Sequence, residues 1–180
     1  MGHWSPIGRR TSSVRLSLAL AVFVALSTTT PLTARAAVTN LLVNPGFENG
    51  TASWGQVSPN ASVDTLAANA HSGTASLKLA ATGYWQATWQ FFSSSPGLSY
   101  TFGGWERAAA GVSEGWIMFN CWDVNGNSVG HSTLVFIGTG SWTFQQGSFT
   151  TPPGTVTVGL GLLSDRAGTF WFDDLSLSTP

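Results

Sequence analysis

Charged side chains are scarce in this chain, and positive ones are scarcest beyond its N-terminal segment. The sequence holds seven Lys and Arg residues against eight Asp and Glu residues, and together they make up 8% of the chain. Four of the basic residues precede residue 37, which leaves Lys78, Arg107 and Arg166 for the rest. So few cations cannot neutralise a run of phosphates. We therefore expect no nucleic-acid partner.

Cysteine and histidine are nearly absent as well. Cys121 is the single cysteine, which excludes an internal disulfide and a cysteine-based zinc site. After residue 36 the sequence has only His71 and His131, without the spacing of zinc ligands. A zinc hydrolase is therefore a poor interpretation of this sequence.

Long apolar runs are missing too, and the one apolar run belongs to a secretory signal pattern. Arg9-Arg10 and Arg15 precede the run from Leu16 to Leu26, and residues 34–36 read Ala-Arg-Ala, as before a cleavage site. The run is shorter than the roughly 20 residues that span a bilayer. We predict a signal peptide over residues 1–36, a secreted, extracellular product and no membrane span. The paired arginines leave the twin-arginine export route open beside the general one.

What remains, residues 37–180, has the length of a single domain. Short stretches rich in β-branched and aromatic residues alternate with Gly, Pro, Asn and Ser, and helical periodicity is absent. The predicted strands are Leu41–Val43, Ser76–Ala80, Tyr84–Phe92, Ser99–Arg107, Gly115–Asp123, Ser132–Ile137, Thr143–Thr150, Thr155–Leu163 and Thr169–Ser178. This pattern predicts an all-β fold, a two-sheet antiparallel β-sandwich of the jelly-roll type.

Seven segments of this domain resemble the jelly-roll carbohydrate-binding modules of families 4, 9 and 22. They are NPGFENG at 44–50, Trp54, AHSGTASLKL at 70–79, PGLSYTFGGWERA at 96–108, WDVNG at 122–126, SWTFQQGSFTTPPGT at 141–155 and GTFWFDDLSL at 168–177. The resemblance implies non-catalytic binding of a polysaccharide, a β-glucan or xylan, on a concave face, and a structural calcium ion. Separately secreted glycoside hydrolases are the partners that such a role implies.

Glu48 and Asp173 are the candidate calcium ligands. Calcium prefers six to eight oxygen ligands, and an ion between the first and last strands would hold both ends of the domain together. Alternation along the last strand puts Asp173 on the same side as Leu175 and Leu177, where an unpaired carboxylate is costly. The resemblance implies further carbonyl ligands from the loop at residues 71–76. The alternative is that both acids accept hydrogen bonds from turn amides, and Asp174 is expected to be a solvated surface acid.

Tryptophan is plentiful, with nine residues, and carries the functional hypothesis. Flat aromatic rings beside amide or charged groups suit the apolar faces and polar edges of sugars. Alternation directs several of these side chains away from the expected core, and we predict that they share one open, carbohydrate-binding face. The candidates are Trp85, Trp89, Trp105, Trp116 and Trp122, with Asn120, Arg107 and, less securely, Gln86 as polar neighbours. The resemblance implies structural positions for Trp54, Trp142 and Trp171. A register error of one residue on any strand would bury its tryptophans.

Two alternative functions remain open. A small glycosidase would need two carboxylates about 5 to 10 Å apart, for which Glu106, Glu114 and Asp123 are the candidates. The motif Gly-Asn-Ser-Val-Gly at 126–130 matches a nucleophile elbow, but a predicted strand rather than a helix follows it. The other alternative is a surface adhesion or assembly module without a sugar ligand.

Overall fold

The computed structural model describes residues 1–3, 39–109 and 113–180. The predicted signal peptide at 1–36 lies outside these residues except for its first three. All the strands belong to the compact unit that spans Ala36–Pro180. Among the described residues, no helix is long and apolar enough to cross a membrane.

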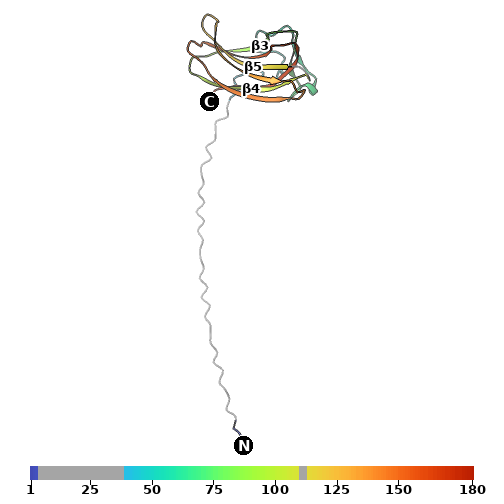
Figure 1. Cartoon of the computed structure of the whole chain (residues 1–180), viewed down its shortest axis with the longest axis vertical. Coiled ribbons are helices and arrows are strands. Elements are labelled where there is room, and N and C mark those ends of the chain that lie inside the picture. The colour runs from blue at the N-terminus through green and yellow to red at the C-terminus, as the bar shows by residue number, and fades with distance from the viewer. Residues whose placement is uncertain (4–38, 110–112) are drawn as a thin grey trace. The chain divides into compact units, whose positions relative to one another are not determined.

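The domain is a sandwich of two antiparallel sheets, as the sequence predicts (Figure 1). The described strands are β1 Ala61–Asp64, β2 Ser76–Ala81, β3 Gln86–Ser93, β4 Ser99–Ala108, β5 Ser113–Trp122, β6 Ser128–Ile137, β7 Thr143–Thr150, β8 Thr157–Ser164 and β9 Gly168–Ser178. One sheet has the order β1-β2-β9-β4-β7 and the other the order β3-β8-β5-β6. We call them the five-stranded and the four-stranded sheet. Chain neighbours such as β2 and β3 lie in different sheets, which is the crossing pattern of a jelly roll.

Period-two alternation builds the core between the sheets. Ile117 and Phe119 of β5 point inward from the four-stranded sheet, and Phe102 of β4 meets them from the five-stranded sheet. The Phe102 and Phe119 rings stack with centroids 5.6 Å apart. Burying each such side chain stabilises the fold by about 1.5–3 kcal/mol. The opposite side of each sheet is thus left for side chains that the core does not use.

The predicted strand Leu41–Val43 is not a strand in the structure. Its backbone is held mainly by side chains: Leu42 donates its N–H to Asn40 Oδ1 at 3.1 Å, and Val43 exchanges two hydrogen bonds with the Gln90 amide, both at 2.9 Å. These amide groups take the places of a neighbouring strand.

Two further elements differ from the sequence prediction. Strand β1, Ala61–Asp64, pairs with β2 although its sequence offers only one β-branched apolar residue. The predicted start of β3 at Tyr84 is wrong. Trp85 has a positive φ of 54°, and the strand begins at the next residue, Gln86. This left-handed backbone is unusual for a bulky residue and sets Trp85 at the corner of the sheet.

Candidate functional site

The outer side of the four-stranded sheet carries most of the predicted tryptophans. Strand pairing arranges its side chains in rows across β3, β8 and β5, with Trp89, Gly161 and Met118 in one row and Phe91, Gly159 and Asn120 in the next. We call this surface the aromatic face and define it by Trp85, Trp89, Phe91, Trp116, Met118, Asn120 and Trp122. Its rings form a cluster separate from the core between the sheets. Trp89, Trp116 and Trp122 therefore point away from the core, as predicted.

Two glycines of the central strand β8 form the floor of the aromatic face. A Cβ atom on Gly161 would lie 2.6 Å from the Trp89 ring, and one on Gly159 would lie 3.0 Å from both Phe91 and Trp122. Real Cβ atoms essentially never come closer than 3.0 Å to other atoms, so a side chain at residue 161 would displace the flat Trp89 ring, whereas one at residue 159 would force Phe91 or Trp122 to shift slightly. The glycines were not predicted as site residues, although small residues inside a strand are a recognisable signal.

The rings of the aromatic face contact one another in two groups. Trp89 stacks on Phe91 with centroids 5.9 Å apart, and Trp122 meets Trp89 edge-on at 5.4 Å. At the other end, Trp85 meets Trp116 edge-on at 5.9 Å. Trp89 is only 9% exposed, whereas Trp85 is 57% exposed. Packing therefore fixes the inner rings in place, while the outer rings keep their faces open to solvent.

Polar groups lie within the aromatic face at two positions. The Asn120 side chain is buried, and its Oδ1 accepts a hydrogen bond from Ser128 Oγ at 2.7 Å, which fixes the orientation of the amide. The indole Nε1 of Trp116 is buried and has no hydrogen-bond partner among the described residues. Gln86 points to the other side of β3, as expected, and its Oε1 accepts from Asn60 at 2.7 Å. Asn120 and Trp116 are thus the polar groups nearest to a ligand on this face, and both are covered by neighbouring side chains in this structure.

Two hollows flank β3 at the edge of the aromatic face, and Gln56 lines both. The first, of about 420 Å³, is lined by Gln56, Phe91, Trp122, Asp123, Val124, Gly126, Val156 and Thr157. We call it the valine hollow. The second, of about 390 Å³ and called the amide hollow, is lined by Gln56, Val57, Ser58, Pro59, Asn60, Trp85, Gln86 and Ala87. The aromatic face therefore continues into a depression near each of its ends.

Trp105 and Arg107 do not join the aromatic face, so the prediction of one shared face is wrong. They point outward from β4, as alternation predicts, but β4 belongs to the five-stranded sheet. The Arg107 guanidinium lies over the Trp171 ring at 4.4 Å and the Trp142 ring at 5.3 Å, and it donates to Asn69 Oδ1 at 2.6 Å. These contacts fasten the segment around Asn69 to the sheet, which is a structural task.

The three tryptophans expected to be structural fit that expectation. Trp54 is buried, packs on Phe47 with centroids 5.0 Å apart and donates its Nε1–H to the Asn44 carbonyl at 3.1 Å. Trp142 and Trp171 are partly exposed and take part in the stack with Arg107. None of the three lies in the aromatic face.

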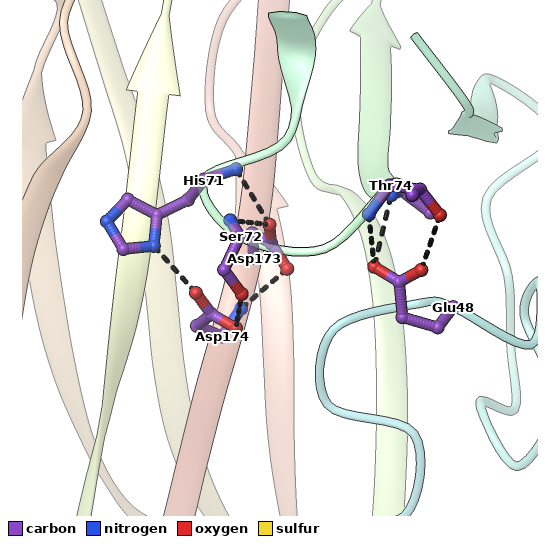
Figure 2. Close-up of polar contacts among 7 residues, drawn as sticks. Glu48, His71, Ser72, Thr74, Asp173 and Asp174 are labelled. Atoms are coloured by element: carbon purple, nitrogen blue, oxygen red, sulfur yellow. Dashed lines mark hydrogen bonds and ion pairs between the residues drawn. The ribbon is translucent and has the colours of Figure 1, made fainter. Parts of the chain in front are cut away.

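Glu48 and Asp173 both bind the loop at residues 71–75, from two sides (Figure 2). Asp173 Oδ2 accepts the backbone N–H groups of His71 at 2.8 Å and Ser72 at 3.2 Å. Glu48 accepts the N–H groups of Thr74 at 2.9 Å and Ala75 at 3.1 Å, and the Thr74 hydroxyl at 2.7 Å. The hydroxyl and then these amides lower the pKa of Glu48, whereas burial raises that of Asp173 against the pull of its own N–H donors.

These contacts bear on the predicted calcium ion. Carboxylate oxygens are the ligands that calcium prefers, but here they are already engaged by N–H and O–H donors, Asp173 at the start of the loop and Glu48 at its end. In the described part of the chain, no three His, Cys, Asp or Glu residues form a group that could hold a metal ion. The hydrogen bonds to turn amides are thus sufficient to account for both acids, and calcium remains a prediction.

The surroundings of Asp173 differ from the prediction in two respects. Asp174 has a positive φ of 47°, and the register of β4 against β9 shifts between Gly103 and Trp105. This irregularity interrupts the alternation, so Asp173 pairs opposite the outward-pointing Trp105 and does not share a side with Leu175. Asp174 is partly buried and bonds His71 Nδ1 at 2.6 Å, which holds the imidazole stacked on Trp105 at 3.8 Å.

Glu106 and Asp123, two of the three candidate catalytic acids, do not come together in the aromatic face. Glu106 points into the core, where burial raises its pKa to about 8. Asp123 lines the valine hollow, but its carboxylate accepts the N–H groups of Asn125 and Asn127 in the β5–β6 turn, and the Asn127 bond is the main cause of its lowered pKa. The Gly-x-Ser-x-Gly motif at 126–130 runs into strand β6 and not into a helix, so it lacks the context of a nucleophile elbow.

Comparison with solved structures places this fold among carbohydrate-binding modules, as the resemblance implies. A family 16 carbohydrate-binding module is 29% identical over 77% of this chain and 99% of its own, with a TM-score of 0.62. The xylan-binding module CBM22-1 of Xyn10C from Paenibacillus barcinonensis is 19% identical, with a TM-score of 0.61 and 81% and 97% of the two chains covered. The family 61 module TmCBM61, solved with β-1,4-galactotriose, is 22% identical, with a TM-score of 0.54 and coverages of 79% and 99%. No protein-family model and no curated protein matches the chain.

Proposed function

We propose that this chain is a secreted, non-catalytic module that binds a polysaccharide, a β-glucan or xylan, on the aromatic face. The observation that carries the proposal is the glycine floor of β8: Trp89 lies flat over it, Phe91 is nearly parallel to Trp89 at 17°, and Trp122 packs edge-on against Trp89 at 75°. Flat rings fixed by packing offer sugars a preorganised apolar surface at little entropic cost.

The solved structures of similar fold support the class of ligand. One of them is a xylan-binding module and another was solved with β-1,4-galactotriose, and both ligands are chains of sugar units. Similar folds can carry different functions, so the ligand must be argued from the face itself. Its partly exposed indoles, together with the polar groups of Asn120 and Trp116, suit the apolar faces and hydroxyl groups of a sugar chain.

A binding function accounts for the site better than catalysis does. Hydrolysis of a glycosidic bond needs two carboxyl groups on either side of the bond. Of the residues that line the two hollows, only Asp123 is acidic, and its oxygens are held by turn amides. In this role the module would retain its polysaccharide near glycoside hydrolases secreted separately.

Affinity electrophoresis of residues 37–180 tests the proposal. We expect one of xylan, mixed-linkage β-glucan, mannan or laminarin to retard the protein in a native gel, with no reducing sugar released in a parallel assay. Release of sugar would replace the proposal with a glycosidase. Retardation by none of them would favour an adhesion or assembly module.

Matched variants locate the binding surface. Trp85→Ala and Phe91→Ala remove exposed rings of the aromatic face and should weaken binding at least about ten-fold, as loss of a central aromatic contact does. Phe144→Ala is the control, since Phe144 is exposed to a similar degree, 46% against 39% for Phe91, but lies on β7 of the other sheet. Equal loss in Phe144→Ala and Phe91→Ala would rule out the aromatic face.

A further inference from the structure

The valine hollow differs in its side chains from the amide hollow. Four of its lining residues are apolar and large, and three of these are exposed: Val124 at 81%, Val156 at 42% and Phe91 at 39%. The amide hollow instead holds Asn60 and Gln86, which bond each other at 2.7 Å. The two ends of the site therefore offer different chemistry to a bound chain.

The polar groups of the valine hollow leave little for sugar hydroxyls. Its one charged residue, Asp123, directs Oδ1 to two backbone N–H groups and Oδ2 to the Asn127 amide at 3.1 Å. Gln56 and Thr157 remain, and within the described residues neither side chain makes a hydrogen bond. Gln56 and Thr157 can pair with some hydroxyl groups of an unsubstituted sugar unit, but the valines offer no partner for the others, at a cost for each hydroxyl group that is buried.

We propose that the valine hollow binds an O-acyl substituent of the polysaccharide, an acetyl ester on a backbone sugar. This inference rests on the proposed function and narrows it to an acetylated chain. The ester methyl replaces a hydroxyl and fits against Val124 and Val156, while its carbonyl can accept a hydrogen bond from Thr157 or from the Gln56 amide. The hollow shares Trp122 and Phe91 with the aromatic face, so a sugar stacked there has its substituents beside it.

The test compares acetylated xylan and acetylated glucomannan with the same polymers after mild alkaline deacetylation. We expect the protein to bind at least one acetylated polymer on the order of ten-fold more tightly than its deacetylated form, since burial of a methyl group and one hydrogen bond supply about that factor. Equal or tighter binding of the deacetylated forms overturns the inference and leaves the proposed function intact. Binding to none of the four polymers would overturn the inference, while the proposed function would then depend on retardation by mixed-linkage β-glucan or laminarin in the affinity gels.

Variants separate the hollow from general effects of acetylation on the polymer. Val124→Ser and Val156→Ser should remove the preference for the acetylated polymer and leave affinity for the deacetylated one within about two-fold. Val57→Ser is the control, because Val57 is also exposed but lines the amide hollow. A preference that persists in the Val124→Ser/Val156→Ser double variant would show that the acyl group binds elsewhere. Both positions are largely exposed, so the fold should tolerate the changes, and thermal melting verifies this.

Discussion

The Trp89 indole lies flat against Gly161 of the neighbouring strand, so close that a Cβ on the glycine would lie 2.6 Å from ring atoms. This contact connects the sequence of β8 to the shape of the aromatic face. A side chain at residue 161 would lift the ring, and Trp89 in turn supports Phe91 and Trp122. The shape of the aromatic face is therefore determined partly by a residue that lies beneath its rings.

Gly161→Ala should displace Trp89 and weaken both the fold and the binding of polysaccharide. Overpacking of this kind costs about 1–3 kcal/mol of unfolding free energy. We expect the loss in denaturant unfolding and a weaker retardation in affinity gels. Gly83→Ala is the control, because a Cβ there meets no atom within 4 Å and the residue has no positive φ. If Gly161→Ala behaves like Gly83→Ala, the flat packing of Trp89 is not a constraint.

Alternation along each strand predicted the direction of most side chains of the site correctly. Ile117, Phe119 and Cys121 are in the core, whereas Trp116 and Trp122 point outward from the same strand. The period of two depends only on local backbone geometry, so it can be read from a sequence. The order of the strands in each sheet depends on pairing between distant parts of the chain, so it cannot be read from the sequence in the same way. This is why Trp105 was grouped with tryptophans that lie on the other sheet.

Irregular backbone is the second limit on what the sequence reveals. Trp85 and Asp174 adopt positive φ angles of 54° and 47°, which are unusual for a bulky residue such as tryptophan and more common for aspartate. One ends the strand pattern at the corner of the aromatic face, and the other coincides with the break in alternation in β9. Gly83 marks a turn just before Trp85, but neither position is itself a glycine, so the sequence does not indicate which residue takes the left-handed backbone.

Arg107 should prove structural and not part of the binding surface. Arg107→Ala removes its contacts with two indoles and with Asn69, and we expect a loss of about 1–2 kcal/mol of unfolding free energy. Binding to polysaccharide should be unchanged once the protein is folded. Arg166→Ala is the comparison for loss of a positive charge away from the indoles: Arg166 is exposed, and its guanidinium lies 3.8 Å from the buried Asp165 carboxylate. Loss of binding without loss of stability in Arg107→Ala would return Arg107 to the site.

Asp173→Ala tests the acids at the loop of residues 71–75. The change leaves the N–H groups of His71, Ser72 and Asp174 without an acceptor, which costs about 1–3 kcal/mol for each buried group that stays unpaired. We expect a lower Tm with a calcium chelator present as well as without it. The predicted calcium ion is checked in the same melts: it requires that added calcium raise the Tm of the unaltered protein and not that of the variant. If the Tm difference between the unaltered protein and Asp173→Ala vanishes in the presence of chelator, then the ion, and not the hydrogen bonds, stabilises the loop.

The buried Glu106 should make the stability of the protein depend on pH. Its Oε1 atom has no hydrogen-bond partner in the described part of the chain, and burial raises its pKa from 4.5 to about 8. Between these two pH values the folded protein retains the Glu106 proton that the unfolded chain has lost. The free energy of unfolding must therefore fall as pH rises from about 4.5 to about 8, by a few kcal/mol in total.

Glu106→Gln keeps the shape of the side chain and removes its titration. The variant should be more stable than the unaltered protein at pH 8, and its unfolding free energy should change less between pH 5 and pH 8. Denaturant unfolding at a series of pH values measures both. Asp64→Asn is the matched control, because hydrogen bonds led by that of Trp171 lower the pKa of Asp64, so this group contributes no fall in stability over the same range. If Glu106→Gln shows the same decline with pH as the unaltered protein, another group is responsible, and Glu106 must be charged or paired in the folded state.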